Sequence, residues 1–390
     1  MSQQLAYVII TPYSLYKSRT GGILSRLITR TGLDLVGLRM FAPSAELVKE
    51  YAEAVVSAYD PQDRKIQELI KQYVLENLSP DPKNGRRRRV MMLLFRGDEA
   101  VRKVRSVVGN LSINRRSGET IRDTYSDLIL DDNGNVRYFE PAVLAAPNAD
   151  EAAHKLKLWA KYSDGDGGIL ENVNTYGPGE TPERTLVLIK PDNFKFPTGR
   201  PGNVIDFFSR TGLYIVGAKV LRMSTAQAME FYGPVREFLR TKLKDGVGAK
   251  ARELFEKEFG FKLTDADQKA LGEILGPVQG DSQFGNIVRF MSGHAPNEIP
   301  QADWPKAGTE KCIALVYEGV NAVSKIRDVL GPTDPSKAPP GSIRREFGST
   351  IMVNAAHASD SVENARREFG IVQPGENNFK QVIEEAYGRV

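Results

Sequence analysis

A histidine stands just ahead of an expected helix start in NAAHASDSVENARREFG, residues 354–370. Imidazole titrates near neutral pH, so His357 could accept a phosphoryl group without a metal to activate it. The helix N-terminus expected after it favours an anion, because its first backbone N–H groups lack partners within the helix. A lone histidine at the end of a core strand is more often structural. Both interpretations are open at this point.

Basic side chains elsewhere in the second half could neutralise phosphates. Arg327 and Arg344 can form a forked positive clamp, and Lys190 follows the short apolar run TLVLI (185–189). The alternatives without a function are that the arginines are solvated surface charges and that Lys190 only ends a strand. No GxxxxGK[ST] motif occurs in the sequence, which excludes a P-loop nucleotide site.

The bulk composition indicates an ordinary globular chain. It has 390 residues, 41% hydrophobic and 26% charged, with a net charge of +4. This length suits two domains, and the mild positive charge permits anionic ligands without demanding nucleic acid. The single cysteine, Cys312, excludes an intrachain disulfide framework and a cysteine-rich zinc site. We expect Cys312 to be a buried strand thiol.

Targeting and surface signals are weak. The N-terminus has no basic region before its short apolar run, and no stretch reaches the ~18 apolar residues of a membrane helix. We therefore expect a soluble, cytoplasmic protein with no membrane partner. The run GRRRR (85–89) is read as a solvated segment before a strand, with nucleic-acid binding as the minority interpretation.

The chain repeats itself. SRLITRTGLDLVGLRM (25–40) matches DFFSRTGLYIVGAKVL (206–221), and GDEAVRKVRSVVG (97–109) matches GVNAVSKIRDVLG (319–331). A third match, GETIRDTY (118–125) with GSIRREF (341–347), falls in the same order. We predict two homologous domains, residues 1–162 and 184–390, joined by a Gly- and Asp-rich linker at 163–183.

Strand and helix periods alternate within each half. In the second half, TLVLI, YIVGAKVL, CIALVYEG and STIMVNA (349–355) read as strands, with helical patterns between them. We expect a last helix from Ser361 to Phe369, capped by Asp360 and closed by Gly370. The pattern predicts an α/β (α+β) sandwich in each half, ferredoxin-like, with a four-stranded antiparallel sheet and helices packed on it.

Two insertions interrupt this plan. Residues 233–283 are charged and helical in character, and the first half has a shorter, different stretch there. Ser224 and Gln227 form an expected capping box just before this insertion. A second insertion, at 294–311, precedes the third strand.

Three stretches together resemble the nucleoside diphosphate kinase family: RTLVLIKPDNF (184–194), SIRREF (342–347) and NAAHASDSVENARREFG. The family's hallmarks are Lys-Pro-Asp after the first strand and Asn-x-x-His-x-Ser-Asp-Ser around its catalytic histidine. Both are present in the right order. The resemblance covers the second half nearly end to end, apart from the insertions.

The resemblance implies a role for each matching residue. His357 would carry the phosphoryl group as a phosphohistidine, Glu368 would hold the imidazole with Ser359 beside it, and Lys190 would complete the catalytic set. Asp360 would help to hold, through water, the Mg²⁺ that travels with the nucleotide. The implied nucleotide contacts are Lys190 and Asn354 for ribose and phosphates, Arg327, Thr333 and Arg344 for the β- and γ-phosphates, Tyr232 near the active site and Ile351 on the pocket wall.

The base site departs from the family pattern. In DSQFGNIV, Gln283 aligns with the family's base-stacking phenylalanine, and Phe284 comes one residue later. We take Phe284 as the stacking residue. Since no side chain is evidently placed to read a base edge, we expect broad use of purine and pyrimidine diphosphates.

The first half lacks the matching chemistry. Aligned by sequence, Thr11 replaces Lys190, Tyr13 replaces Asp192 and Leu111 replaces Thr333. The stretch VLAAPNADEAA puts Ala146 in place of His357, Val143 in place of Asn354 and Lys157 in place of Glu368. Of the phosphate-binding residues only Arg105 and Arg122 persist, either as a weak anion site or as interface residues.

The resemblance therefore implies a nucleoside diphosphate kinase with one catalytic and one degenerate domain. Its partners would be ATP and nucleoside diphosphates, with Mg²⁺ as cofactor. It would form a homo-oligomer that uses the two domains as a pseudo-dimer. The alternative is a nucleotide-binding regulatory or scaffold protein with little turnover.

Overall fold

The computed structural model describes residues 3–60, 62–111 and 117–390, which form two compact units. The first unit runs to Val220 and includes Ile313–Phe369 and Gln373–Val390. The second comprises Leu221–Cys312 and Gly370–Val372. Both sheets of the repeat lie essentially in the first unit, and the second is mainly helical.

The first sheet has the strand order β2-β3-β1-β6, with antiparallel neighbours throughout. Its strands are β1 (Gln4–Ile10), β2 (Asp34–Phe41), β3 (Val90–Gly97) and β6 (Val143–Ala145). The helices of this half are α1 (Pro12–Tyr16), α2 (Thr20–Thr31), α3 (Ala45–Val55), α4 (Arg64–Asn77), α5 (Ala100–Val108), α6 (Ile121–Tyr125) and α7 (Ala149–Asp166). A short hairpin, β4 (Asp127–Leu130) and β5 (Val136–Glu140), precedes β6.

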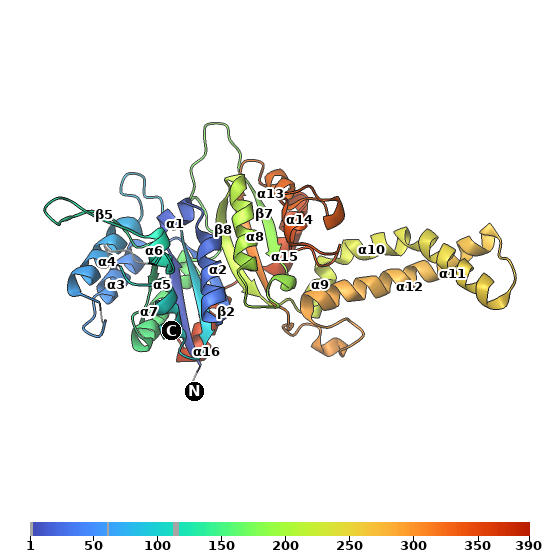
Figure 1. Ribbon diagram of the computed structural model, residues 1–390, viewed down its shortest axis with the longest axis horizontal. Coiled ribbons are helices and arrows are strands. Elements are labelled where there is room, and N and C mark those ends of the chain that lie inside the picture. Colours follow the sequence, from blue (N-terminus) through green and yellow to red (C-terminus); the bar gives the residue numbers. More distant parts are fainter. Residues whose placement is uncertain (1–2, 61, 112–116) are drawn as a thin grey trace. The chain divides into compact units, whose positions relative to one another are not determined.

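The second sheet repeats this plan with the order β10-β7-β9-β8. Its strands are β7 (Glu183–Ile189), β8 (Tyr214–Leu221), β9 (Cys312–Gly319) and β10 (Ala356–Ala358). The helices of this half are α8 (Arg200–Phe208), α13 (Ala322–Leu330), α14 (Ile343–Phe347) and α15 (Val362–Val372). The last helix, α16 (Asn378–Tyr387), packs against α7, β1 and β2 of the first half. In each half the first strand is central and pairs with the third and the fourth, so the predicted fold class is confirmed (Figure 1).

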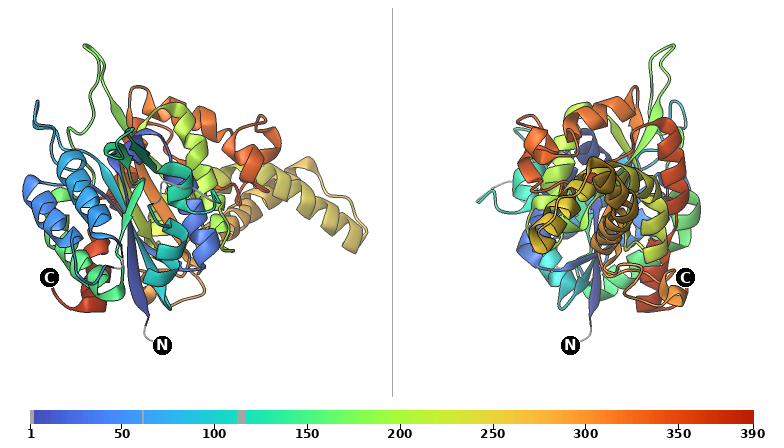
Figure 2. Two further views of the ribbon diagram at one scale, coloured as in Figure 1. Left: turned by 60° about the vertical axis from the view of Figure 1, so that its left-hand side comes forward. Right: turned by 90° about the vertical axis from the view of Figure 1, so that its right-hand side faces the viewer.

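The two halves meet inside the first unit where α2 packs against α8 (Figures 1 and 2). The backbones approach closely, because a Cβ built on Gly21 would lie 2.2 Å from the Gly202 carbonyl oxygen. Ser25 Oγ also donates to the Gly199 oxygen at 2.7 Å. Asp206 accepts hydrogen bonds from the Gly21 and Gly22 amides, and its burial at this contact raises its pKa to about 6.

The fourth strand is shorter and later than the sequence predicts. Residues 349–355 are not a strand, and β10 begins at Ala356. The segment instead closes on itself, with the Ser349 and Thr350 amides donating to the Val353 oxygen. Ala355 then adopts a left-handed backbone at φ +69°, which a regular strand does not allow.

The segment predicted as a linker begins inside a helix, since α7 continues to Asp166. Gly167 forms an isolated bridge with Phe41 of the first half, and the Leu170 amide donates to the Val216 oxygen of the second. Further along, Asn174 and Tyr176 donate to the carboxylate of Glu318. Much of the connection is therefore held against both halves.

The arginine run before β3 has structural partners. Arg87 pairs with Asp166 at 2.9 Å, Arg88 donates to the Glu76 oxygen at 2.5 Å and Arg89 donates to the Ile215 oxygen at 2.7 Å. Arg86 donates to Thr175 Oγ1. These guanidinium groups connect the segment before β3 to α4, to the end of α7 and to the strand that contains Ile215, which gives the run a role other than nucleic-acid binding.

The second unit holds the predicted helical insertion. Its helices are α9 (Thr225–Phe231), α10 (Gly233–Lys242), α11 (Lys244–Phe259) and α12 (Asp265–Ser292). The capping box of Ser224 and Gln227 is present at the start of α9. Along α12, Gly272 and Gly276 let the backbone of Lys244 approach, so that α11 and α12 lie side by side (Figure 2). No helix in the described part of the chain is long and apolar enough to cross a membrane.

Candidate active site

His357 lies in the short strand β10, where it pairs with Leu188 of β7. Its Nε2 is 3.0 Å from Oε1 of Glu368 in α15, and 23% of its side chain is exposed. Ser359 Oγ donates to the other oxygen of Glu368 at 2.5 Å. A carboxylate at Nε2 favours the tautomer with its proton there, so that the lone pair is on Nδ1. The buried Glu368 can thus orient a partly exposed imidazole.

The helix that supplies Glu368 starts and ends differently from the prediction. Its N-cap is Ser361, whose hydroxyl accepts from the Asn364 amide at 3.0 Å, and not Asp360. The helix also continues past Gly370 to Val372, because Gln373 supplies the left-handed end. Asp360 is exposed just outside the helix and accepts from Asn364 Nδ2 at 2.5 Å.

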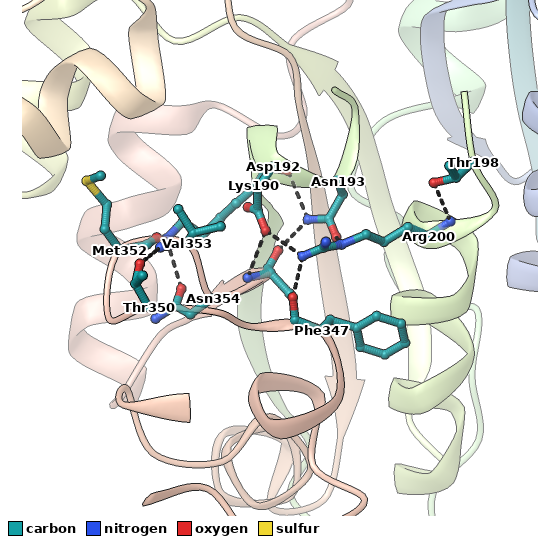
Figure 3. A network of polar contacts seen from close by, with 11 residues as sticks. Lys190, Asp192, Asn193, Thr198, Arg200, Phe347, Thr350, Met352, Val353 and Asn354 are labelled. Atoms are coloured by element: carbon teal, nitrogen blue, oxygen red, sulfur yellow. Dashed lines mark hydrogen bonds and ion pairs between the residues drawn. The ribbon is translucent and has the colours of Figure 1, made fainter. Parts of the chain in front are cut away.

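Lys190 and Asn354 form a buried pair at the end of β7 (Figure 3). Lys190 Nζ donates to Asn354 Oδ1 at 2.9 Å and to the Met352 oxygen at 2.5 Å. Asn354 Nδ2 in turn donates to the Thr333 and Ile351 oxygens at 3.1 and 2.8 Å. This network brings together four residues that the sequence assigns to nucleotide binding. The backbone at Thr333 and Ile351 is held, while both residues are exposed.

Arg344 is buried next to the histidine strand. Its Nη1 donates to the Gly331 oxygen at 3.0 Å and its Nη2 to the Ala356 oxygen at 3.3 Å. Arg327 is exposed in α13, and its carbonyl accepts from the Gly331 amide. Arg344 therefore links the loop after α13 to the residue before His357.

A resident metal centre has no ligand set in the described residues, since no three His, Cys, Asp or Glu side chains there lie close enough together to hold an ion. Asp360 offers one exposed carboxylate. Mg²⁺ commonly uses one or two carboxylates together with water and substrate phosphates, so a single carboxylate fits an ion that arrives with the nucleotide.

Tyr232 and Phe284 lie in the second unit. Phe284 is only 4% exposed, with the Arg236 guanidinium 5.8 Å from its ring centroid. It borders a cavity of about 550 Å³ within this unit, together with Trp304, Asp281 and Asn286. Base stacking by Phe284 stays a prediction.

Two residues near this network were not assigned from the sequence, Asp192 and Arg200. Arg200 Nη2 donates to Asp192 Oδ2 at 2.8 Å, and its Nε donates to Asn193 Oδ1 at 2.9 Å (Figure 3). The Lys-Pro-Asp motif contains Asp192, but no spacing rule pairs it with an arginine eight residues later.

The first sheet shows what occupies the histidine position there. Leu144 pairs with Ile9 just as His357 pairs with Leu188, each opposite the last but one residue of the first strand. The sequence alignment, which placed Ala146 there, was therefore wrong by two residues. With the same shift, Ala146 is the equivalent of Ser359. The equivalent of Glu368 is then Lys155 and not Lys157.

Thr11, which stands at the lysine position of the first half, belongs to a hydrogen-bond network around Glu140. Thr11 Oγ1 donates to Glu140 Oε1 at 2.9 Å, and the Tyr73 hydroxyl donates to Glu140 Oε2 at 2.6 Å. Burial raises the pKa of Glu140 above its usual value, against the hydrogen bonds that favour the carboxylate. Thr11 in place of Lys190, with the buried carboxyl group of Glu140 beside it, disfavours phosphate binding.

Arg122 persists for a structural reason. Its Nη1 donates to the Gly109 oxygen at 3.0 Å and its Nη2 to the Val143 oxygen at 3.3 Å. These are the counterparts of the two bonds of Arg344. In both halves the equivalent arginine therefore donates to two backbone carbonyls in the same way. This structural role requires no bound anion.

Comparison with known proteins assigns the chain to a family. The profile "Nucleoside diphosphate kinase" matches residues 183–239 and 302–377. The nucleoside diphosphate kinase of Wolinella succinogenes is 32% identical over 193 residues, 50% of this chain and 96% of that protein. That of Staphylothermus marinus is 30% identical over 190 residues, 49% and 92% of the two chains. The chain belongs to the nucleoside diphosphate kinase family.

Solved structures are also similar over the same share of the chain. The Aquifex aeolicus nucleoside diphosphate kinase is 26% identical, with 49% of this chain and 95% of that chain covered and a TM-score of 0.30. The NDP kinase from Pyrobaculum aerophilum is 26% identical with the same coverage and a TM-score of 0.32.

Proposed function

We propose that the chain is an active nucleoside diphosphate kinase whose second domain, residues 184–390, transfers the γ-phosphate of ATP to nucleoside diphosphates. The observation that carries the proposal is the position of His357: partly exposed, with Nε2 at 3.0 Å from a buried carboxylate that Ser359 also holds. This arrangement leaves the other ring nitrogen available as the nucleophile.

The reaction proceeds in two balanced steps. A lone pair of the imidazole attacks the γ-phosphorus, the bond to the β–γ bridging oxygen breaks and ADP leaves. A terminal phosphate oxygen of the acceptor diphosphate then attacks the phosphohistidine, and the imidazole is released. Glu368 offsets the positive charge that develops on the ring, and holding the ring in place lowers the entropic cost of both attacks.

The basic and amide groups around the histidine bind the nucleotide in this proposal. Lys190 and Asn354, joined at 2.9 Å, face ribose and phosphates. The β- and γ-phosphates are bound by Arg327, Thr333 and Arg344, with Ile351 on the pocket wall. Mg²⁺ shields the phosphate charges when bound, and Asp360 would contact it through water.

Nucleotide choice is broad in this proposal. The assigned contacts go to phosphates and ribose, which all nucleotides share, and strong discrimination requires a site built to pair a base's polar groups. Phe284 is buried, so little of its ring is available for base stacking. Losing a good stack costs ~1–3 kcal/mol if the value for bases on aromatic side chains transfers.

The first domain, residues 1–162, is degenerate in this proposal because Leu144 replaces the acceptor histidine. It serves as the structural partner of the second domain, and the pseudo-dimer formed through α2 and α8 assembles further as a homo-oligomer. The site of action is the cytoplasm, where ATP and nucleoside diphosphates are available.

Steady-state kinetics test the proposal. ATP and a nucleoside diphosphate are varied against each other, and parallel double-reciprocal plots are expected from a phosphoenzyme route. Tight nucleotide binding with turnover no better than that of His357→Ala would overturn it in favour of a regulatory nucleotide-binding protein. The burial of Phe284 is the observation that favours this second candidate function, a regulatory nucleotide-binding protein.

A further inference from the structure

Arg200 connects three segments around the end of β7 (Figure 3). It starts α8, and its guanidinium donates to Asp192 Oδ2 at 2.8 Å, to Asn193 Oδ1 at 2.9 Å and to the Phe347 carbonyl oxygen. Asp192 and Asn193 lie two and three residues after Lys190, and Phe347 ends α14. One side chain thus joins the first helix of the second half to the lysine motif and to the segment that leads into the histidine strand.

Asp192 and Asn193 in turn form hydrogen bonds with the backbone of Ala355. Asp192 Oδ2 accepts from the Ala355 amide at 3.3 Å, and Asn193 Nδ2 donates to the Ala355 oxygen at 2.7 Å. Ala355 is the left-handed residue that separates Asn354 from β10. A left-handed backbone at a non-glycine residue persists only when its surroundings hold it. Two residues further on is His357.

Arg200 is the cation paired with the buried carboxylate of Asp192. Only 2% of the Asp192 side chain is exposed, and its Oδ1 accepts no hydrogen bond from the described residues. A buried carboxylate that loses its cation is strongly destabilising, because its desolvation is then uncompensated. Removing Arg200 should therefore disturb Asp192 first and, through it, the Ala355 backbone.

The first half provides an internal comparison. Arg19, at the start of α2, donates to the Tyr125 oxygen at 2.7 Å, as Arg200 does to Phe347. Tyr125 and Phe347 each end the equivalent short helix. Tyr13 stands where Asp192 does, and Arg19 lies 5.3 Å from its ring centroid. The carbonyl contact is therefore common to both halves, while the pairing with a carboxylate occurs in the half that has the histidine.

We propose that Arg200 and Asp192 form a positioning pair that sets the Asn354–His357 segment against Lys190 for phosphoryl transfer. This inference rests on the proposed kinase function. Arg200 acts through Asp192, Asn193 and Ala355. Its loss should lower kcat more than it raises KM, because most of the nucleotide-binding residues remain.

The experiment compares Arg200→Ala, Arg200→Lys and Asp192→Asn with a matched control, Arg19→Ala, in the full chain. Misplacing a reacting group by about 1 Å costs on the order of 100-fold, so Arg200→Ala should lower kcat by roughly 10- to 100-fold with KM within about 3-fold. Arg200→Lys should recover part of the loss, since lysine keeps the charge but not the fork. Arg19→Ala should stay within about 2-fold of wild type, because it removes the equivalent carbonyl contact in the half that lacks the histidine.

Two further measurements separate positioning from simple instability. Hydrogen exchange of a peptide covering residues 350–358 should quicken in Arg200→Ala and Asp192→Asn but not in Arg19→Ala. The double variant Arg200→Ala/Asp192→Asn should be no slower than Arg200→Ala, because paired residues are not additive. If Arg200→Ala fails to fold, Arg200→Lys and Asp192→Asn decide the question by the same kcat and exchange measurements.

The possible failures are distinguishable. A wild-type protein with turnover and an Arg200→Ala variant with at least half its kcat would overturn the positioning role while leaving the kinase proposal intact. Equal losses in Arg19→Ala and Arg200→Ala would also overturn it. A wild-type protein without any nucleotide turnover would instead refute the kinase proposal on which the inference rests.

Discussion

His357 and Leu144 occupy the same place in the two sheets of this chain. Each is the middle residue of a three-residue strand, and each pairs with the last but one residue of its first strand, Leu188 or Ile9. The residue after the first strand differs in the same way, since Lys190 in one half corresponds to Thr11 in the other. The two halves share backbone geometry here and differ in the side chains to which phosphoryl transfer is assigned in the proposed function.

Glu368→Gln should slow turnover by about 10-fold or more without preventing phosphorylation of the protein. Glutamine keeps the shape and can still accept from Ser359, but it lacks the negative charge that offsets the developing imidazolium. Stopped-flow or quench-flow measurement of phosphoenzyme formation checks this. Ser359→Ala is the control, since it removes only one hydrogen bond to the carboxylate, and it should have the smaller effect. Equal rates for wild type and Glu368→Gln would reduce Glu368 to a structural carboxylate.

Arg122→Ala should destabilise the fold and leave the chemical step unchanged. Arg122 is 1% exposed and holds two backbone carbonyls, and burial lowers its pKa to about 9. Losing hydrogen bonds from a buried charged group should reduce the free energy of unfolding by about 2–4 kcal/mol.

Thermal unfolding and kcat, measured well below the transition, separate the two effects for Arg122→Ala and Arg344→Ala. The second variant should lose both stability and turnover. If Arg122→Ala cuts kcat as deeply as Arg344→Ala, the first domain takes part in catalysis and its degenerate assignment fails.

Gly202→Ala should destabilise the contact between α2 and α8. A Cβ at Gly202 would lie 2.1 Å from the Gly21 carbonyl oxygen, so the two helices would have to move apart. We expect the free energy of unfolding to fall by about 1–3 kcal/mol, the range for overpacking. In the absence of a clash, a change from glycine to alanine inside a helix normally raises that free energy by about 0.5–1 kcal/mol. Gly165→Ala in α7 is the matched control, because nothing lies within 4 Å of its Cβ position. Denaturant unfolding of both variants decides the sign, and stabilisation by Gly202→Ala would contradict the close approach.

Asp206→Asn should change how stability depends on pH. The folded pKa of Asp206 is about 6, raised by burial, against about 3.9 in the unfolded chain. Between these values the folded state holds the proton more tightly, so this group's stabilisation is lost as pH rises from about 4 to 6. Asparagine removes that loss and can still accept from the Gly21 and Gly22 amides.

The unfolding temperatures of wild type and Asp206→Asn therefore need comparison at pH 4.5 and 7.5. Relative to wild type, the variant should gain stability at the higher pH. The gain should be about 1 kcal/mol at most, after allowance for partial solvent screening. A difference that stays constant between the two pH values would mean that Asp206 titrates normally.

Much of the second half could be predicted from the sequence because local signals and the repeat agreed. The run TLVLI became β7, and the capping box of Ser224 and Gln227 formed as expected. The motif residues Lys190, Asn354 and His357 lie at adjacent strand ends in the structure. The motifs identified these residues from the sequence, although the strand that holds His357 begins later than predicted.

The errors have tertiary causes. STIMVNA reads as a strand by its apolar residues, but the left-handed Ala355 and the network that holds it end the pattern before β10. In VLAAPNADEAA several alanines resemble one another, so only the pairing of Leu144 with Ile9 sets the register. Arg200 was missed because no spacing rule pairs it with Asp192 and Asn193, and because Phe347 is distant in the sequence.

Phosphorylation of the protein itself tests the central claim most directly. Wild type and His357→Ala are incubated with γ-labelled ATP and Mg²⁺ in the absence of acceptor, and the label is followed through acid and alkali treatment. We expect acid-labile, alkali-stable label on wild type, its transfer to an added nucleoside diphosphate, and none on a folded His357→Ala variant. An unlabelled wild-type protein, or equal label on the two, would contradict the assignment of His357 as the phosphoryl carrier.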